Sequence, residues 1–198
     1  FFMARTIFGL IAAALVVASA AAQDVPYRSV LISAKDNVAA PDSQITVASV
    51  LGKSDIPGTI TLRTLRGGKQ EGVRIVSVDN GALTIDIIPT RGMGILAVTL
   101  NAETKPGDRF RLGWKSPVAE IVHPKFVNLN LRGGLGWLEG FNEWLARCGL
   151  ENVGQAGQDE IINNVGDKQK VDLTLHGRIA NIPASEVVVL IDKKPPHR

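Results

Sequence analysis

The side chains with the greatest capacity for chemistry lie in three turn-rich segments, residues 89–94, 116–124 and 175–184. Arg and Asn carry hydrogen-bond donors that fit neighbouring hydroxyls, and His can give or take a proton near neutral pH. An indole ring can cover the apolar face of a sugar ring. Together these residue types favour sugar recognition, and the three segments contain Arg91, His123, His176, Arg178 and Asn181.

A structural role remains an alternative for each of these residues, because a single His or Arg at a turn often serves only as a structural hydrogen-bonding group. For Arg91 the alternative is a salt bridge with a carboxylate such as Glu139 or Asp86, and Arg suits both roles equally well. Cys148, the single cysteine, is expected to be a small buried hydrophobic residue rather than a nucleophile.

Several familiar motifs are absent or accidental. Residues 92–97 fit a dinucleotide fingerprint, but 95–100 has the pattern of a strand where the fingerprint needs a helix. The three histidines lie far apart in the sequence, and a single cysteine excludes both a disulfide framework and a zinc site with several cysteines. We therefore expect no metal and no cofactor.

The composition is that of an ordinary globular chain. Hydrophobic residues make up 45% of the 198 residues, which excludes global disorder. There are 22 Lys and Arg against 19 Asp and Glu, and the net charge of +3 is spread along the chain. This distribution lacks the basic patch of a nucleic-acid-binding protein, so we expect no nucleic-acid partner.

Residues 1–22 have the layout of a signal peptide. Arg5 supplies a positive start, residues 7–18 are almost wholly apolar, and Ala20–Ala22 fits a small-residue cleavage site. The apolar run is shorter than the about 20 residues that a membrane span needs. We expect export to the periplasm or the medium and no membrane association after cleavage. Residues 23–43 are polar and predict a flexible lead-in.

From residue 44 onward, the pattern predicts mainly β structure, arranged as a sandwich or barrel. Short stretches of apolar and polar alternation are separated by turn residues, and Asn80–Gly81 between two such stretches predicts a type I′ hairpin. Residues 187–191 are apolar throughout, which predicts a strand covered on both faces. The stretches that predict strands include 45–51, 59–63, 73–78, 83–87, 95–100, 110–114, 171–175 and 187–191.

One stretch has a helical period. Trp137, Phe141, Trp144, Leu145 and Cys148 recur at the spacing of one helix face, and Gly149 follows as a candidate cap. This spacing predicts a short helix near 138–148. An amphipathic helix that plugs the end of a sandwich and a helix that lines a site are both consistent with it.

An ordered set of motifs between residues 73 and 192 resembles the DUF4432 family, which is similar to aldose 1-epimerases and belongs to the galactose mutarotase-like superfamily. These motifs are residues 89–94, 112–117, 123–124, 134–138, 148–150 and 175–184. The resemblance implies a β-supersandwich, with residues 44–198 as part of that domain, and a small-molecule sugar as ligand.

The resemblance also implies interconversion of sugar anomers by acid and base catalysis. It assigns the acid to His176, whose His-Gly motif matches that of the superfamily, and sugar-hydroxyl binding to Arg178. Arg91 and His123 also lie in family motifs and are expected to contact substrate, followed by Asn181 and Trp137.

The base in mutarotases is a glutamate from the C-terminal part of the sandwich, whereas this sequence ends one predicted strand after His176. Glu139, Glu143 and Glu160 are available, but their spacing marks none of them as the base. We therefore expect the N-terminal portion of a larger sandwich. The alternatives are a non-catalytic carbohydrate-binding module on the same fold and an interaction domain without a small-molecule site.

Overall fold

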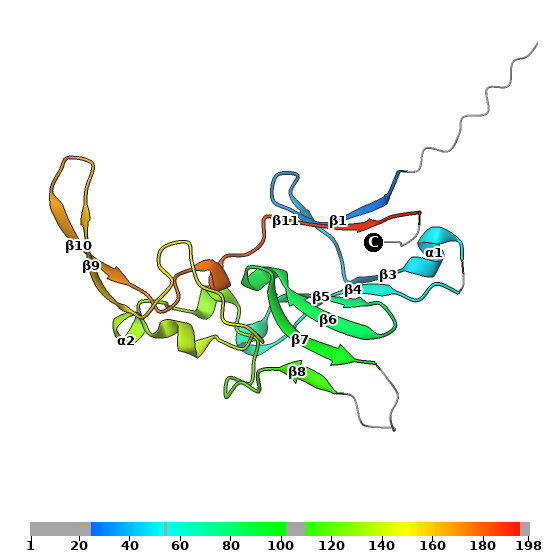
Figure 1. The fold of residues 1–198 in the computed structure, drawn as a ribbon, viewed down its shortest axis with the longest axis horizontal. Coiled ribbons are helices and arrows are strands. Elements are labelled where there is room, and N and C mark those ends of the chain that lie inside the picture. The colour runs from blue at the N-terminus through cyan, green and yellow to red at the C-terminus, as the bar shows by residue number, and fades with distance from the viewer. Residues whose placement is uncertain (1–24, 54, 102–109, 195–198) are drawn as a thin grey trace, which may run out of the picture.

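The computed structural model describes residues 25–53, 55–101 and 110–194 (Figure 1). Within these ranges the chain is mainly β, with three antiparallel sheets joined by turns and very short helices. The helical segments are α1 (Val47–Leu51), η1 (Gly68–Gln70), η2 (Pro89–Arg91), η3 (Pro124–Phe126), α2 (Leu131–Gly134), η4 (Gly136–Glu139) and η5 (Ile179–Asn181).

The largest sheet has six strands that follow one another in sequence order. Each strand pairs with the next, because short turns return the chain antiparallel to itself. The strands are β3 (Ser43–Thr46), β4 (Thr59–Thr64), β5 (Arg74–Asp79), β6 (Leu83–Ile88), β7 (Gly94–Leu100) and β8 (Arg111–Gly113).

The hairpin between β5 and β6 is confirmed, but its turn is not type I′. Only Gly81 has a left-handed backbone, with φ of 90°, and Asn80 is outside that region. The Asn80 Oδ1 atom instead accepts hydrogen bonds from the backbone N–H groups of Ala82 and Leu83. The turn is therefore stabilised by an Asn side chain that replaces a backbone acceptor.

A second sheet packs over one face of the first. It contains β11 (Glu186–Ile191), β1 (Tyr27–Ser33) and β2 (Val38–Ala39), with β1 in the middle. The core between the two sheets is apolar and consists of Leu31, Ile60, Leu62, Val76, Val187 and Ile191. Apolar burial of this kind contributes about 25 cal/mol for each Å² removed from water.

The predicted flexible lead-in over 23–43 is wrong for residues 27–33, which form β1. Leu31 is 2% exposed and Ser33 is also buried, so this strand belongs to the core. Its pairing partner, β11, lies at the other end of the described chain, and Val30 is opposite Val188. About half of the residues of β1 are polar, so its sequence alone does not indicate a core strand. Its place in the core becomes clear only from its pairing with β11.

The opposite face of the six-stranded sheet has its own smaller core. Side chains of successive strand residues point to opposite faces, so Val76 faces the second sheet while Ile75 faces away from it. Ile75 packs there with Val73, Ile88, Leu96 and Ala97, and Ile121 covers them from the segment after β8. Both faces of the sheet therefore hold apolar side chains.

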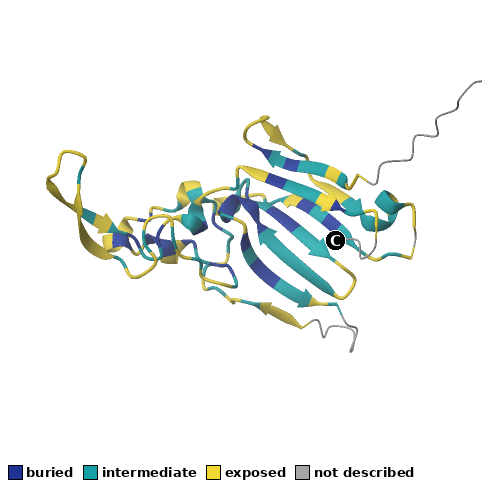
Figure 2. Cartoon of the chain, turned by 45° about the horizontal axis from the view of Figure 1, so that its top comes forward, coloured by how far each residue is buried: buried dark blue, intermediate teal, exposed yellow. Residues whose placement is uncertain are grey.

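The third sheet is a hairpin of β9 (Gly157–Ile162) and β10 (Lys168–Leu173) that projects from the molecule at the end opposite α1 (Figure 1). Most of its residues are exposed (Figure 2). The turns and short helices of residues 114–156 and 174–185 lie between this hairpin and the six-stranded sheet, and they carry most of the predicted site residues.

The predicted helix near 138–148 is wrong. Only Gly136–Glu139 is helical, as the short 3-10 helix η4, and residues 140–148 have no helix. Their polar groups bond to other segments instead. The backbone N–H of Trp144 donates to Ile95 O at 2.8 Å, and the side chain of Asn142 donates to Val118 O at 3.1 Å. Tertiary hydrogen bonds thus override the helical period of the apolar residues.

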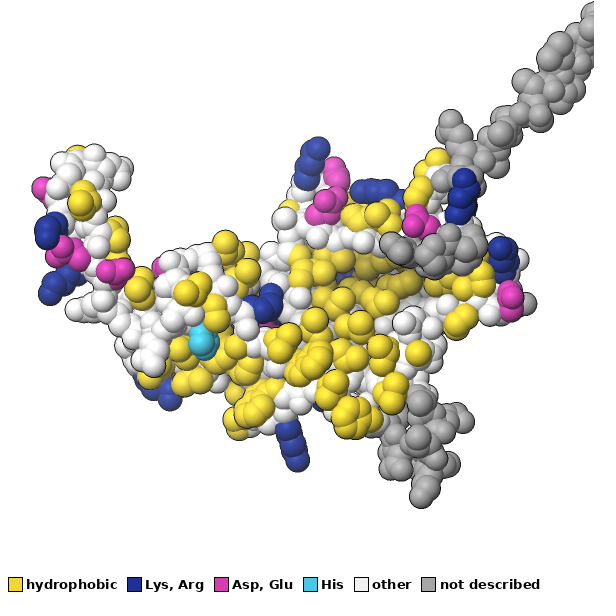
Figure 3. All heavy atoms as spheres, in the orientation of Figure 1, with side chains coloured by type: hydrophobic (Ala, Val, Ile, Leu, Met, Phe, Trp, Pro, Cys, Tyr) yellow, Lys and Arg dark blue, Asp and Glu magenta, His cyan; other side chains and the backbone are white. Residues whose placement is uncertain are grey.

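The expectation that residues 187–191 are covered on both faces is also wrong, because Leu190 is 58% exposed. An open groove of about 530 Å³ runs between β11 and the six-stranded sheet. Its lining is largely apolar and includes Val47, Ile87 and Met93. Figure 3 shows hydrophobic side chains gathered over this part of the surface.

The predicted signal peptide, residues 1–22, lies outside the described residues. Within the described residues, no helix has the length and apolar character to cross a membrane. The boundary predicted at residue 44 remains a prediction.

We predict that Leu31→Ala lowers the free energy of unfolding by about 2–5 kcal/mol, because it leaves a cavity between the two sheets. Leu190→Ala on the paired strand is the matched control, and its exposed side chain should cost less than about 1 kcal/mol. Urea denaturation of both variants measures the difference. Equal losses would contradict the assignment of β1 to the core.

Candidate functional site

His176 lies in a tight turn just after β10. Its φ is 61°, a left-handed backbone that few non-glycine residues adopt. Three backbone hydrogen bonds fix this turn. The N–H of His176 donates to Gly154 O at 2.9 Å, that of Gly149 donates to His176 O at 3.1 Å, and that of Gly177 donates to Thr174 O at 3.2 Å. Strained backbones of this kind often occur at functional sites.

Gly177 lets a second segment approach this turn closely. Its φ is 72°, and a Cβ atom at this position would lie 2.6 Å from the carbonyl oxygens of Gly149 and Asn152. A side chain would therefore separate the two segments. The close approach allows a parallel bridge between Gly149 and Gly177, which sets the preceding residues, Cys148 and His176, next to each other.

The imidazole of His176 is held by two side chains. Cys148 Sγ lies 3.2 Å from its Nδ1 atom, within hydrogen-bond distance for sulfur. The indole of Trp137 meets the imidazole edge to face, with ring centroids 4.7 Å apart. Cys148 is exposed, so the expectation of a buried hydrophobic cysteine is wrong.

Trp137 supports His176 rather than offering an open ring face. It is 5% exposed, and Phe141 stacks on it with centroids 4.1 Å apart. The aromatic row continues to Trp114, whose centroid is 6.5 Å from that of Phe141 and which is about half exposed. Trp114 is thus the accessible indole of this row, and sequence reasoning did not select it.

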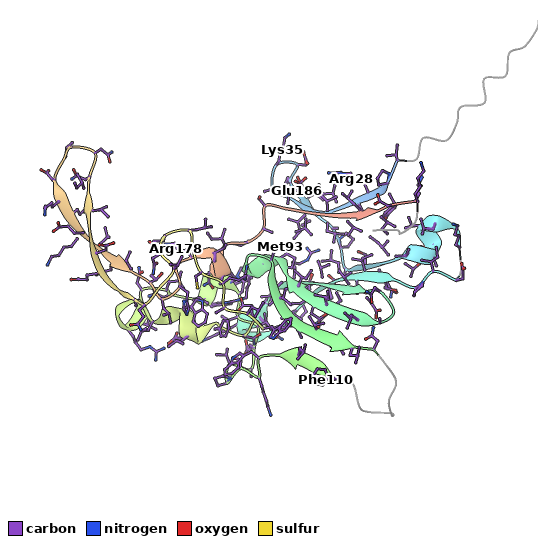
Figure 4. The ribbon with its side chains drawn as sticks, in the orientation of Figure 1. Arg28, Lys35, Met93, Phe110, Arg178 and Glu186 are labelled. Atoms are coloured by element: carbon purple, nitrogen blue, oxygen red, sulfur yellow. The ribbon has the colours of Figure 1, made fainter. Side chains whose placement is uncertain are left out.

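Arg178 and Asn181 follow His176 on the same segment. Arg178 is exposed, as the labelled side chain in Figure 4 shows, and its guanidinium lies 3.1 Å from a carboxylate oxygen of Glu151. Asn181 ends η5, and both polar atoms of its side chain are buried with no hydrogen-bond partner among the described residues. Buried amide groups are normally hydrogen-bonded, so a buried water is the expected partner of these two atoms.

Arg91 is completely buried and has a structural role. Its Nε donates to Glu143 Oε1 at 2.8 Å and its Nη1 donates to Val122 O at 2.8 Å. The salt bridge that the sequence offered as an alternative role for Arg91 is therefore present. Its partner is Glu143 rather than Glu139 or Asp86. The Arg91 side chain is 0% exposed, so it cannot contact a substrate in this structure.

A second arginine completes this buried cluster. Arg147 donates to Arg91 O at 2.7 Å and also to Gly92 O, and its guanidinium lies 3.9 Å from Glu143. Burial lowers the pKa of Arg147, and the positive charge of Arg91 adds to this effect, while the negative charge of Glu143 opposes it. The cluster joins the turn before β7 to the segment that precedes Cys148.

His123 caps the short helix η3 instead of approaching His176 directly. Its Nδ1 accepts a hydrogen bond from the Lys125 N–H at 3.1 Å. Burial lowers the pKa of His123, and the positive charges of Lys125 and Arg91 lower it further. The folded protein therefore favours the neutral form of the His123 imidazole.

The six candidates thus fall into separate groups. The structure brings His176 and Trp137 into contact and places Arg178 and Asn181 on the adjoining turn, whereas Arg91 and His123 are occupied by structural bonds. Sequence reasoning missed Cys148 and Glu151 as neighbours of this turn. The only available signal was that Cys148 and His176 each precede a glycine in a family motif.

The carboxylates considered as bases are all paired. Glu139 lies 3.3 Å from Arg132, Glu143 lies 2.8 Å from Arg91, and Glu160 lies 2.8 Å from Lys168. Among the described residues, no group of three or more His, Cys, Asp or Glu side chains could hold a metal ion.

Two hollows of the described surface lie away from the candidate residues. None of the six candidates lines the groove beside β11. None lines a second hollow of about 240 Å³ between α2 and the base of the β9–β10 hairpin.

A comparison with solved structures finds a similar fold in a crystal structure. The chain is similar to the 1.90 Å crystal structure of a protein described as a "putative aldose 1-epimerase" from Klebsiella pneumoniae subsp. pneumoniae MGH 78578. The sequences are 35% identical and the TM-score is 0.66. The match covers 87% of this chain and 41% of that one, so this chain spans less than half of the relative's length. The mainly β, aldose 1-epimerase-like fold is thus confirmed.

The family follows from the sequence match. The model of the Domain of unknown function (DUF4432) matches residues 70–198, which is well over half of the chain. The chain therefore belongs to the DUF4432 family, as its ordered motifs indicate. No curated protein matches it.

We predict that Glu143→Gln lowers the free energy of unfolding by about 3–5 kcal/mol, because it leaves buried Arg91 without its counter-charge. The matched control is Glu160→Gln, which removes the exposed ion pair with Lys168 and should cost less than about 1 kcal/mol. Thermal and urea denaturation measure both. Similar small losses in the two variants would contradict a structural role for the cluster.

We also predict that His123 contributes to the pH dependence of stability. Because its pKa in the folded state lies below the ordinary value of 6.5, its contribution is present above that pH and is lost as the pH falls through the lowered pKa. The free energy of unfolding should therefore fall more between pH 7.5 and pH 5 in the wild type than in His123→Asn. Denaturation at several pH values tests this, and parallel curves would refute it.

Proposed function

We propose that the turn around His176 binds a sugar and takes part in the interconversion of the sugar's anomers. The observation that carries this proposal is the imidazole itself, which sits on a left-handed backbone, packs against Trp137 and has Cys148 on one ring nitrogen. The similarity to an aldose 1-epimerase structure supports it.

The chemistry needs one acid and one base. The base takes the proton of the anomeric hydroxyl while the acid protonates the ring oxygen, and the bond between the anomeric carbon and the ring oxygen breaks. The carbonyl group rotates, and reclosure on its other face returns both protons and gives the other anomer. His176 is the acid in this proposal, because its Nε2 atom is free of hydrogen bonds to the described residues.

Arg178 can bind a sugar by exchanging its present ion-pair partner for a sugar hydroxyl. Its exposed guanidinium already holds the Glu151 carboxylate, and a sugar hydroxyl can join or replace that partner. The guanidinium supplies the kind of polar contact that a carbohydrate site needs. The amide of Asn181, three residues further on, is buried and would contact a sugar only after this turn rearranges.

Binding without catalysis is a second candidate function. The observation that favours it is the pairing of Glu139, Glu143 and Glu160 with basic side chains, which leaves none of them as a free base beside His176. In this case the same turn would hold a sugar and leave its anomeric ratio to change at the uncatalysed rate.

We further propose that the protein is exported. Residues 1–22 support this through their positive start, apolar run and small-residue cleavage site. Detection of the mature protein, beginning near Gln23, in the periplasm or the medium tests the proposal. Retention of the intact protein in the cytoplasm would refute it.

We predict that His176→Gln slows anomer exchange at least about 100-fold, as expected for loss of a general acid. His123→Gln is the matched control and should keep nearly full activity. Saturation-transfer NMR on a panel of free aldoses measures the exchange rate, and calorimetry measures binding. Unchanged exchange in His176→Gln would refute the catalytic proposal, whereas sugar binding without any wild-type exchange would favour the binding module.

A further inference from the structure

The sulfur of Cys148 is the one side-chain atom described within hydrogen-bond distance of the His176 ring nitrogens. The Sγ atom lies 3.2 Å from Nδ1, which is within the range for a hydrogen bond that involves sulfur. Whichever atom carries the proton, Nδ1 is occupied by this contact. The nitrogen that remains for a ligand is Nε2.

Backbone hydrogen bonds hold Cys148 and His176 in positions that allow this contact. The N–H of Gly149 donates to His176 O, and the N–H of Arg178 donates to Gly149 O at 3.1 Å. These bonds and the bridge between Gly149 and Gly177 fix Cys148 opposite His176. Because Gly177 has no side chain, the two segments come close enough for the sulfur to reach the ring.

The imidazole is restrained from a second direction as well. The indole plane of Trp137 lies at 72° to the imidazole plane of His176. Phe141 stacks on the same indole. Trp137 restricts where the ring can lie, but its indole N–H makes no hydrogen bond to the ring or to any other described residue. Rotation of the ring by 180° about the Cβ–Cγ bond would exchange Nδ1 with Cδ2 and Nε2 with Cε1, and it would break the contact between Nδ1 and the sulfur.

We propose that Cys148 is a positioning residue for His176. Its sulfur holds Nδ1 and so presents Nε2 to the sugar bound at this turn. This inference rests on the proposed function of His176, and it gives the exposed cysteine a chemical role that requires neither a disulfide nor a nucleophilic step.

The first experiment examines the ring directly in the full-length protein without any ligand. In ¹⁵N NMR, Cys148→Ala should shift the Nδ1 resonance of His176 more than its Nε2 resonance, because only Nδ1 loses a partner. Cys148→Ser should keep most of the wild-type pattern, since a hydroxyl can also bond to Nδ1. Leu145→Ala, an exposed substitution on the same segment, should leave both resonances unchanged.

The second experiment separates positioning from folding. Cys148→Ala should lower kcat for anomer exchange about 10- to 100-fold with KM changed less than about twofold, because a misplaced acid slows chemistry more than binding. Cys148→Ser should recover most of the loss. Thermal denaturation of each variant establishes that the fold persists.

The outcomes distinguish this inference from the proposed function. An unchanged Nδ1 resonance in Cys148→Ala, or full kcat in that variant while His176→Gln is inactive, would overturn the positioning role alone. Full exchange by His176→Gln would overturn the proposed function whatever the NMR spectra show. A shifted Nδ1 resonance together with reduced kcat and serine rescue supports both.

Discussion

The buried ion pair between Arg91 and Glu143 is the constraint on which the site depends. The two side chains are 0% and 1% exposed, and charges this deep in the protein are costly unless they remain paired. Arg91 belongs to the turn between β6 and β7, whereas Glu143 belongs to the irregular segment that leads to Cys148. The pair therefore fixes that segment, which has no helix of its own, against the large sheet.

The ion pair is connected to the His176 turn through the residues that follow Glu143. Arg147 extends the cluster along the same segment, and the following residues reach the His176 turn through the bridge between Gly149 and Gly177. Trp137 connects the other side of the imidazole to the aromatic row. The functional histidine is thus held by loops, and these loops are rigid because buried charges, backbone hydrogen bonds and stacked rings each restrain them.

Local patterning was sufficient to predict most strands of the large sheet, because their apolar and polar residues alternate, but residues 47–51 of the predicted strand 45–51 form α1 instead. β1 was missed because its partner is far away in the sequence, and the helix near 138–148 failed because tertiary hydrogen bonds override its period. At the site, residue type alone could not separate the structural Arg91 from the exposed Arg178. That distinction requires burial, and burial depends on Glu143, a residue far from Arg91 in the chain. The family resemblance, rather than spacing, singled out His176.

The pairing of β1 with β11 has a consequence for biosynthesis. Val30 pairs with Val188, so β1 has only its short pairing with β2 until the ribosome has made nearly all of the remaining described chain. The six-stranded sheet can form progressively during this time, since each of its strands pairs with its neighbour. The pairing of β1 with β11 is therefore the last pairing among the described strands that can form during synthesis.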